Sequence, residues 1–188
     1  MATATAIAGT GASVSTGSGG TKPWGNPGGI TADDSSYAST AGVFYTTEGS
    51  YFLRATNFGF SIPSGATING ITATIRANAS YYDGFAGDYV YVTSVVLLKG
   101  GTRGGSDLSD SADIISSEAS YVYGATNTLW GNTWSASDIN SSNFGLDFQV
   151  VLVDTNGQGA YPFVDYIQLS IDYTPAAAST NANMLMVF

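Results

Sequence analysis

Residues 57–77 read NFGFSIPSGATINGITATIRA, the stretch in which strand and turn patterns are clearest. From 71 to 77 every second residue is apolar and the others are polar, which is the period of a strand with one buried face. From 58 to 62 large apolar side chains also occupy every second position. Between the two runs, Pro63, Ser64 and Gly65 favour a tight turn. The stretch therefore predicts a strand, a reversal and a second strand.

The pair Asn69-Gly70 interrupts this alternation between Ile68 and Ile71. Such a pair forms either the turn of a hairpin or a bulge within one strand. Because residues 63–65 already reverse the chain, we favour the bulge.

The rest of the chain has the composition of an all-β protein rich in turns. Of its 188 residues, only 10% are charged, 13% are aromatic and 24 are glycine, and apolar runs rich in β-branched and aromatic residues recur between turn residues. Beyond the opening stretch, these runs lie at 43–47, 51–56, 88–99, 114–123, 145–154 and 163–173. The first two predict a hairpin around Glu48-Gly49-Ser50.

The run at 88–99 is the longest, and both of its faces are apolar, which predicts a strand in the middle of a sheet. Alternation assigns one face to Val90, Val92, Val96 and Leu98, and the other to Tyr89, Tyr91, Val95 and Leu97. In the last run, Ile167, Leu169 and Ile171 are expected to face the core.

Seven or eight strands with almost no helix predict an antiparallel two-sheet β-sandwich of jelly-roll type. A capping box from Ser135 to Asp138 adds one short helical turn at 136–141. We divide the chain into an extended N-terminal arm (1–22), the sandwich (23–175) and a C-terminal docking tail (176–188). The arm is small and polar, so it has little surface to bury on its own.

The charge balance excludes several classes of partner. Five Lys and Arg against fourteen Asp and Glu give a net charge of -9, which disfavours nucleic acid and anionic membranes. The sequence has neither cysteine nor histidine, so thiol chemistry and histidine-based catalysis are absent. Neither a secretory signal nor a run long enough to span a bilayer is visible.

Catalytic candidates are few, and we expect no enzyme. A serine nucleophile would need Lys22 or Lys99 as its base, and both are expected to be solvated. Carboxylates for glycoside hydrolysis would come from Asp147, Asp154, Asp165 and Asp172 on strands, although Asp in a sandwich more often caps strand ends.

Calcium is the stronger hypothesis for the acidic residues, although no cofactor is expected. Asp83 and Asp88 bracket a glycine turn, and aspartates recur every third residue at 107, 110 and 113. Neither group matches an EF-hand loop, and a solvated acidic loop is the plainer interpretation.

Aromatic residues suggest a glycan-stacking platform. Its core is Tyr81, Tyr82 and Phe85 in a turn-rich connection, with Tyr121, Tyr123, Trp130 and Trp134 as further candidates. The alternative is that both tryptophans cover the core from the short helical turn.

Four motifs carry a family resemblance. They are WGNPGGI (24–30), NFGFSIPSGATINGI (57–71), YGATNTLWGNTWSASDINSSNFGL (123–146) and VDYIQLSIDY (164–173). Together they resemble a group of β-sandwich proteins found among tailed-bacteriophage virion genes and prophage regions. The resemblance implies a capsid decoration protein, a head fibre or a tail-associated module, and it brings no catalytic residues.

Three functions follow as expectations. The first is a non-enzymatic capsid decoration protein on the virion surface, a homo-oligomer such as a trimer, held on the major capsid protein or another virion protein by its arms. Its docking peptide would be Met184, Leu185, Met186, Val187 and Phe188. The alternatives are a carbohydrate-binding or adhesin module of a tail fibre, and a subunit of an extracellular filament joined by strand donation.

Overall fold

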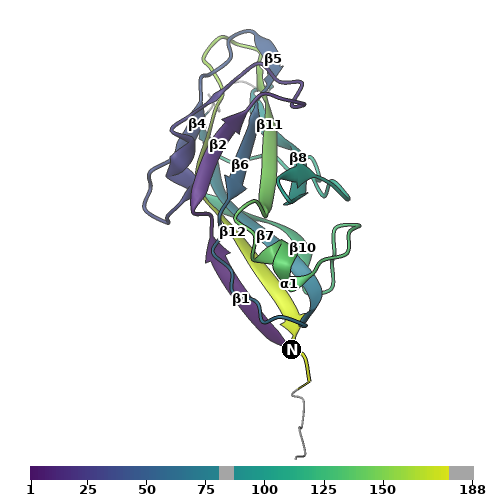
Figure 1. The fold of residues 1–188 in the computed structure, drawn as a ribbon. Coiled ribbons are helices and arrows are strands. Elements are labelled where there is room, and N and C mark those ends of the chain that lie inside the picture. The colour runs from purple at the N-terminus through teal and green to yellow at the C-terminus, as the bar shows by residue number, and fades with distance from the viewer. Residues whose placement is uncertain (81–86, 178–188) are drawn as a thin grey trace, which may run out of the picture.

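The computed structural model describes residues 1–80 and 87–177. Its strands form two antiparallel sheets packed face to face, which confirms the predicted all-β sandwich (Figure 1). Sheet A contains, in spatial order, β10 (Ala119–Ala125), β7 (Thr67–Ser80), β12 (Tyr161–Thr174), β4 (Ala38–Thr40) and β3 (Trp24–Gly25), with β1 (Ala2–Ile7) also on β12. Sheet B contains β2 (Thr10–Val14), β6 (Phe52–Thr56), β11 (Gly145–Asp154), β8 (Tyr89–Lys99) and β9 (Thr102–Arg103), with β5 (Thr46–Gly49) also on β11.

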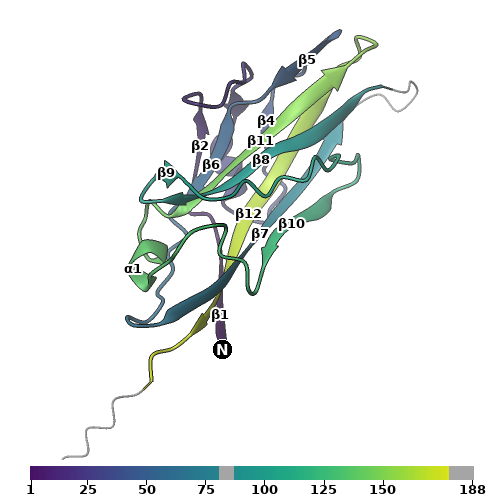
Figure 2. The ribbon, with the colours of Figure 1, turned by 90° about the vertical axis from the view of Figure 1, so that its right-hand side faces the viewer.

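The chain passes back and forth between the two sheets in the manner of a jelly roll. From β7 onward it moves from sheet A to β8 and β9, back to β10, across to β11 and back to β12. Figure 2 shows the two layers from the side. Because the chain changes sheet after most strands, most strand pairs join residues that are distant in sequence.

The core between the sheets is built by alternation along the long strands. Ile71, Ile75, Ile167, Leu169 and Phe148 all have 0% exposure. Burying one such side chain contributes about 1.5 to 3 kcal/mol. The inward direction predicted for the last strand is therefore confirmed.

Asn69 is the extra residue of a bulge in β7. Gly70 pairs with Asp172 and Ile68 pairs with Tyr173, so one residue of β7 has no partner on β12. The predicted bulge is confirmed. It lets residues on both sides of Asn69 keep their apolar side chains in the core.

The tight turn at residues 63–65 is also confirmed. The N–H of Ala66 donates to the carbonyl of Pro63 at 3.2 Å, and Gly65 has a φ of 75°. The segment before the turn differs from the prediction: Phe58, Phe60 and Ile62 are buried, but residues 57–62 form no strand.

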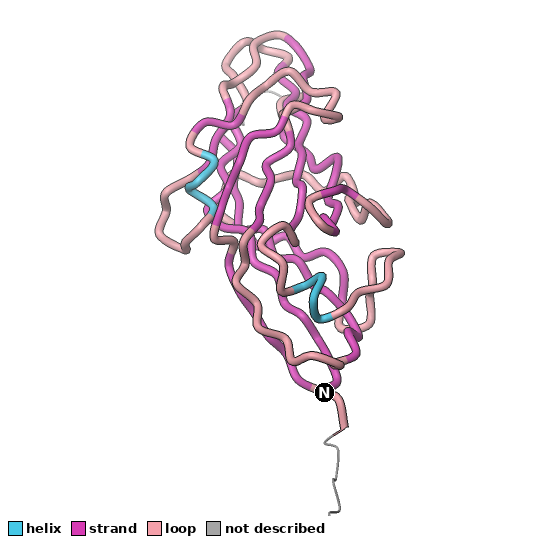
Figure 3. The backbone as a smooth tube through the Cα atoms, in the orientation of Figure 1, coloured by secondary structure: helices cyan, strands magenta, loops and turns pink. Residues whose placement is uncertain are grey.

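The reason is that sheet A extends beyond sheet B at the lower end of Figure 1. There, the loop before the turn and the short helix α1 (Ala136–Ile139) cover the sheet instead of a strand (Figure 3). Phe58, Phe60 and Trp134 all pack on Phe144, with ring centroids 5.4 to 6.3 Å apart. These aromatic contacts replace ladder hydrogen bonds in holding the loop.

The helix itself begins as predicted. The N–H of Asp138 donates to Oγ of Ser135, and the N–H of Ser135 donates to the Asp138 carboxylate at 2.9 Å, a complete capping box. A 3-10 turn, η1 (Pro27–Ile30), is a second short helical element.

Residues 1–22 are not an arm through most of their length, contrary to the prediction. β1 pairs with β12 over six residues, and β2 pairs with β6 over five. The chain crosses between the sheets at Gly9, where a Cβ would collide with the carbonyl of Asn57. Backbone pairing to two existing strands orders this segment although its side chains are small.

The predicted hairpin around residues 48–50 is wrong. β5 and β6 do not pair with each other, because both pair with β11 one after the other. Ser50 lies between them with 0% exposure, and its hydroxyl accepts the N–H of Val150 at 3.1 Å. The residues expected to turn the chain therefore continue along one partner strand.

The face assignment in β8 is half wrong. Ser94 pairs with Gln149 and Val92 pairs with Val150, so Thr93 forms a bulge. The residues that enter the inter-sheet core are Val90, Val92, Val95 and Leu97. The bulge exchanges the two faces midway, which alternation alone does not predict. Two further expectations for this run also differ from the structure. β8 is shorter than β7 and β12, and it lies next to the edge of sheet B instead of in its middle, with β11 on one side and only the short β9 on the other.

Candidate functional site

Asp154 fixes the loop that joins β11 to β12. Its carboxylate is 1% exposed and accepts backbone N–H groups of four residues, at 3.0 to 3.3 Å: Tyr45, Asn156, Gly157 and Gly159. Burial alone would raise the pKa of Asp154, but these four donors hold it below its usual value. The loop is therefore organised around a buried negative charge.

Asp88, the residue just before β8, holds the same loop. One carboxylate oxygen accepts the N–H of Thr155 at 2.8 Å and its hydroxyl at 3.0 Å, and the other accepts the side-chain amide of Asn156. Two carboxylates, one at the end of β11 and one just before β8, thus fix the start of the loop. A loop held in this way loses little further conformational entropy when it binds a ligand.

Exposed aromatic rings lie against this loop. Phe44 is 55% exposed and Tyr45 is 74% exposed. The ring of Tyr45 lies where Gly157 would carry a Cβ, and Gly157 has a φ of 79°. Glycine therefore lets the ring lie directly on the backbone while it remains accessible to solvent.

Tyr161 is held in the same manner. A Cβ on Gly42 or on Gly159 would collide with its ring. Phe44 contacts Tyr161 edge to face, with centroids 6.3 Å apart and planes at 78°. Phe44, Tyr45 and Tyr161 thus form one cluster of rings supported by glycine.

A second pair of rings lies on the outer face of sheet B. Tyr89 is 39% exposed, and its ring centroid is 5.6 Å from that of Tyr91. Tyr89 pairs with Val153, and Thr46 pairs with Asp154, so both ring groups occupy the same end of the sandwich, the upper end in Figure 1. We call Phe44, Tyr45, Tyr89, Tyr91 and Tyr161 the aromatic end.

The sequence did not single out the aromatic end. The pattern that could have predicted it is the presence of aromatic residues within a few positions of glycine, in GVFYTTEG (42–49) and NGQGAY (156–161). The predicted platform of Tyr81, Tyr82 and Phe85 lies outside the described residues. The described strand ends next to it, Ser80 and Tyr89, belong to the same end of the sandwich, since Ser80 pairs with Tyr161.

The two tryptophans belong to the core, as the alternative interpretation held. Trp130 is 1% exposed, and its indole N–H donates to the carbonyl of Ile71 at 2.8 Å. Trp134 is 9% exposed and donates to the carbonyl of Leu129. Tyr123 is 4% exposed, and Tyr121 is half-buried against the core.

The four strand carboxylates considered for catalysis are divided between the sheets and already have partners. In sheet B, Asp147 pairs with Arg54 and Asp154 caps its loop. In sheet A, Asp165 accepts the N–H of Ser35 at 2.8 Å, and Asp172 accepts the hydroxyl of Thr3. They are not presented in pairs across one open cleft.

The two lysines have acidic partners. Lys22 lies 3.5 Å from Glu48, and Lys99 lies 3.2 Å from Asp138. Within residues 1–80 and 87–177, no hydrogen bond joins either ammonium group to a serine hydroxyl. The arrangement needed for a Ser-Lys nucleophile is not formed there.

The acidic loop at 107–113 uses its carboxylates to support itself. Asp107 accepts the hydroxyl of Ser94 at 2.6 Å and the N–H of Val95 at 2.9 Å, and Asp110 accepts the N–H of Ala112. In the described part of the chain, no group of three acidic residues is placed to hold a metal ion. Asp83, the partner proposed for Asp88, lies outside that part.

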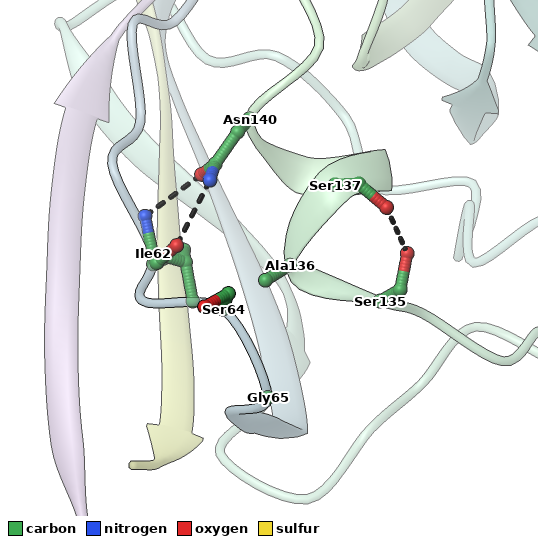
Figure 4. A pocket seen from close by; sticks show the side chains of 7 residues that line it. All are labelled: Ile62, Ser64, Gly65, Ser135, Ala136, Ser137 and Asn140. Atoms are coloured by element: carbon green, nitrogen blue, oxygen red, sulfur yellow. Dashed lines mark hydrogen bonds between the residues drawn. The ribbon is translucent and has the colours of Figure 1, made fainter. Parts of the chain in front are cut away.

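A hollow of about 250 Å³ lies at the opposite end of the sandwich, between α1 and the turn at 63–65 (Figure 4). The side chain of Asn140 forms its back by accepting the N–H of Ile62 at 2.7 Å and donating to the carbonyl of Ile62 at 2.9 Å. Ser64, Ser135 and Ser137 contribute hydroxyl groups to its rim. The hollow has no exposed aromatic ring, unlike the aromatic end.

No protein-family model matches the chain, and no curated protein sequence matches it. Solved structures similar to it include a CBM4 domain, with 13% identity and a TM-score of 0.37, covering 90% of this chain and 94% of that one. Another is the CBM22-1 xylan-binding domain of Paenibacillus barcinonensis Xyn10C, with 12% identity and a TM-score of 0.37, covering 94% of this chain and 100% of that one.

Among the helices described, none has the length and apolar character needed to cross a membrane.

Proposed function

We propose that this protein is a non-catalytic carbohydrate-binding module that holds glycans at its aromatic end. The observation that carries the proposal is the pair Phe44 and Tyr45, more than half exposed on a segment that buried Asp154 holds in place. Large aromatic rings left exposed on a rigid support are costly unless they have a partner.

Sugars fit such a surface because their C–H faces stack on aromatic rings while their hydroxyl groups need polar neighbours. The exposed Gln158, between the glycines on which Tyr45 and Tyr161 lie, supplies an amide donor and acceptor. Asn156 holds the loop instead, because its amide is bonded to Asp88 and to the N–H of Gln158. The net charge of -9 opposes acidic glycans, so the ligand class is a neutral polysaccharide.

The proposal that the module is non-catalytic is supported by the partners that its carboxylates already have. Asp154 and Asp88 are committed to the loop, and Asp147 is committed to Arg54. A glycosidase needs a carboxylic acid and a second carboxylate facing one bond. The carboxylates beside the aromatic end instead shape the surface that holds the sugar.

The virion role expected from the sequence depended on two projecting arms. The first of these is built into the two sheets, which removes one support for that role. The docking peptide Met184 to Phe188 lies outside the described residues. A glycan-binding module on a virion surface remains compatible with the proposal, because the aromatic end would serve equally well there.

The test is affinity electrophoresis and calorimetry with a panel of neutral polysaccharides that includes soluble xylan. Tyr45→Ala and Phe44→Ala are each expected to weaken binding about tenfold, since one stacked ring contributes about 1 kcal/mol or more. Val122→Ala, which removes a 59% exposed side chain on β10, is the matched control and keeps wild-type affinity. Failure of the wild-type protein to bind any member of the panel, or full binding by both ring variants, overturns the proposal.

A further inference from the structure

The free edge of sheet A at β1 is open to a further strand. β1 pairs with β12 on one side only, and it forms the outer margin of the lower half of the molecule in Figure 1. Its register from Ala2 to Ile7 is continuous, without a bulge. A regular edge of this length offers unpaired N–H and C=O groups to another chain.

The direction of those groups follows from the pairing with β12. The N–H of Ala8 donates to the carbonyl of Ile167 at 2.9 Å, so Ala8 and Ile167 form a hydrogen-bonded pair. Such pairs alternate along an antiparallel ladder. Ala2, Ala4 and Ala6 therefore direct their backbone groups to β12, whereas Thr3, Thr5 and Ile7 direct theirs to the free edge.

None of the usual protections of an edge strand is present in β1. Its sequence, ATATAI, has no charged residue, no proline and no glycine. The threonine hydroxyls do not shield the edge, because Thr3 donates to Asp172 and Thr5 bonds Ser170 at 2.9 Å on the outer face of sheet A.

The outer edge of β8, by contrast, is covered. Along β8, residues 108–114 form backbone hydrogen bonds, such as Val92 N–H to the carbonyl of Ala112 at 3.0 Å. The protein's own chain thus protects β8, whereas among the described residues no backbone hydrogen bond reaches the outer side of β1.

We infer that β1 pairs antiparallel with β1 of a second copy, which joins two A sheets into one continuous sheet across a twofold axis. With Ala4 opposite Ala4 of the second copy, Thr3 lies opposite Thr5 and Ala2 lies opposite Ala6. The strand is thus complementary to itself: hydroxyl side chains meet on one face and methyl groups on the other. The outward N–H and C=O groups of Thr3 and Thr5 bond to each other across the axis.

The second copy is favoured as occupant by this self-complementarity. Two chains of charge -9 repel each other, so we expect the dimer to strengthen as salt screens that repulsion. The aromatic end lies at the opposite end of the sandwich, so the dimer would present two of them.

Sedimentation velocity over a range of concentration and salt tests the inference. The wild-type chain is expected to form a dimer, and Thr5→Pro to raise its dissociation constant at least about tenfold, because proline removes an outward N–H without touching the bonds to β12. Thr72→Ala, on the outer face of sheet A in β7, is the control that dimerises normally. A monomeric wild type at every condition, or a Thr5→Pro variant that dimerises equally well, overturns the inference.

A second measurement does not depend on how Thr5→Pro folds. The chain has no cysteine, so T3C and T5C chains can be mixed under oxidising conditions. Opposed residues of a hydrogen-bonded antiparallel pair lie about 5.5 Å apart at Cα, within reach of a disulfide. We expect cross-linking between T3C and T5C chains in excess of cross-linking within either alone. An absence of this preference contradicts the twofold pairing.

Discussion

Arg54 on β6 and Asp147 on β11 form a two-pronged ion pair across neighbouring strands of sheet B. Nε of Arg54 lies 2.8 Å from Oδ1, and its second nitrogen lies 2.9 Å from Oδ2. Asp147 has no solvent exposure, and Arg103 approaches the same carboxylate at 3.6 Å. Removing Arg54 therefore leaves the buried carboxylate with only Arg103, which lies close but does not hydrogen-bond to it, to offset its charge.

We therefore expect Arg54→Met to lower the free energy of unfolding by about 3 kcal/mol. The control is Lys22→Met, which breaks the more exposed pair with Glu48 and is expected to cost less than about 1 kcal/mol. Denaturant unfolding monitored by tryptophan fluorescence measures both. Equal losses in the two variants would show that the Arg54 pair is not specially stabilising.

Gly65→Val is expected to destabilise the domain by about 1 to 3 kcal/mol. Its φ of 75° is poorly tolerated by a β-branched residue, and the new Cβ would lie 3.3 Å from Cβ of Ala176. Gly25→Val in β3 is the control, since the nearest atom to its Cβ lies at 3.5 Å and its φ is not positive. Thermal melting compares them, and an unchanged midpoint for Gly65→Val would refute the role of this turn.

Asp154→Asn tests the loop of the aromatic end. Because the pKa of Asp154 is lowered in the folded protein, its carboxylate stabilises the fold above its unfolded pKa of about 3.9, and this contribution is lost as pH falls through the folded value. The variant should therefore melt earlier than the wild type at neutral pH, and the difference should shrink on acidification. A difference that is constant with pH would point to a cause other than the charge.

Asp165→Asn should have the opposite effect. Burial raises the pKa of Asp165, the N–H groups of Ser35 and Asp34 lower it in part, and Asp33 and Glu118 raise it further. A raised folded pKa means that the wild type loses stability as pH rises from the unfolded value through the folded one. The variant should thus melt later than the wild type at neutral pH and equally at about pH 3. An earlier melting point at neutral pH would contradict this.

Features set by neighbours within a few residues could be predicted from the sequence alone. The alternation from Ile71 to Ala77, the turn at Pro63 to Gly65 and the capping box at Ser135 all depend on local backbone preferences and short hydrogen bonds. The bulge at Asn69 belongs with them, because Asn-Gly marks it locally.

Features set by distant partners were decided by the tertiary structure. Residues 2–7 and 10–14 became strands because β12 and β6 offered free edges. The small, polar side chains of this segment do not indicate that such partner strands exist. The bulge at Thr93 exchanged the faces of β8 in register with β11. The aromatic end arose because Tyr45, Tyr89 and Tyr161, separated by more than forty residues from one another in the printed sequence, meet around a loop fixed by Asp154. Each outcome depends on long-range backbone pairing, whereas sequence patterns report only what each segment can bury.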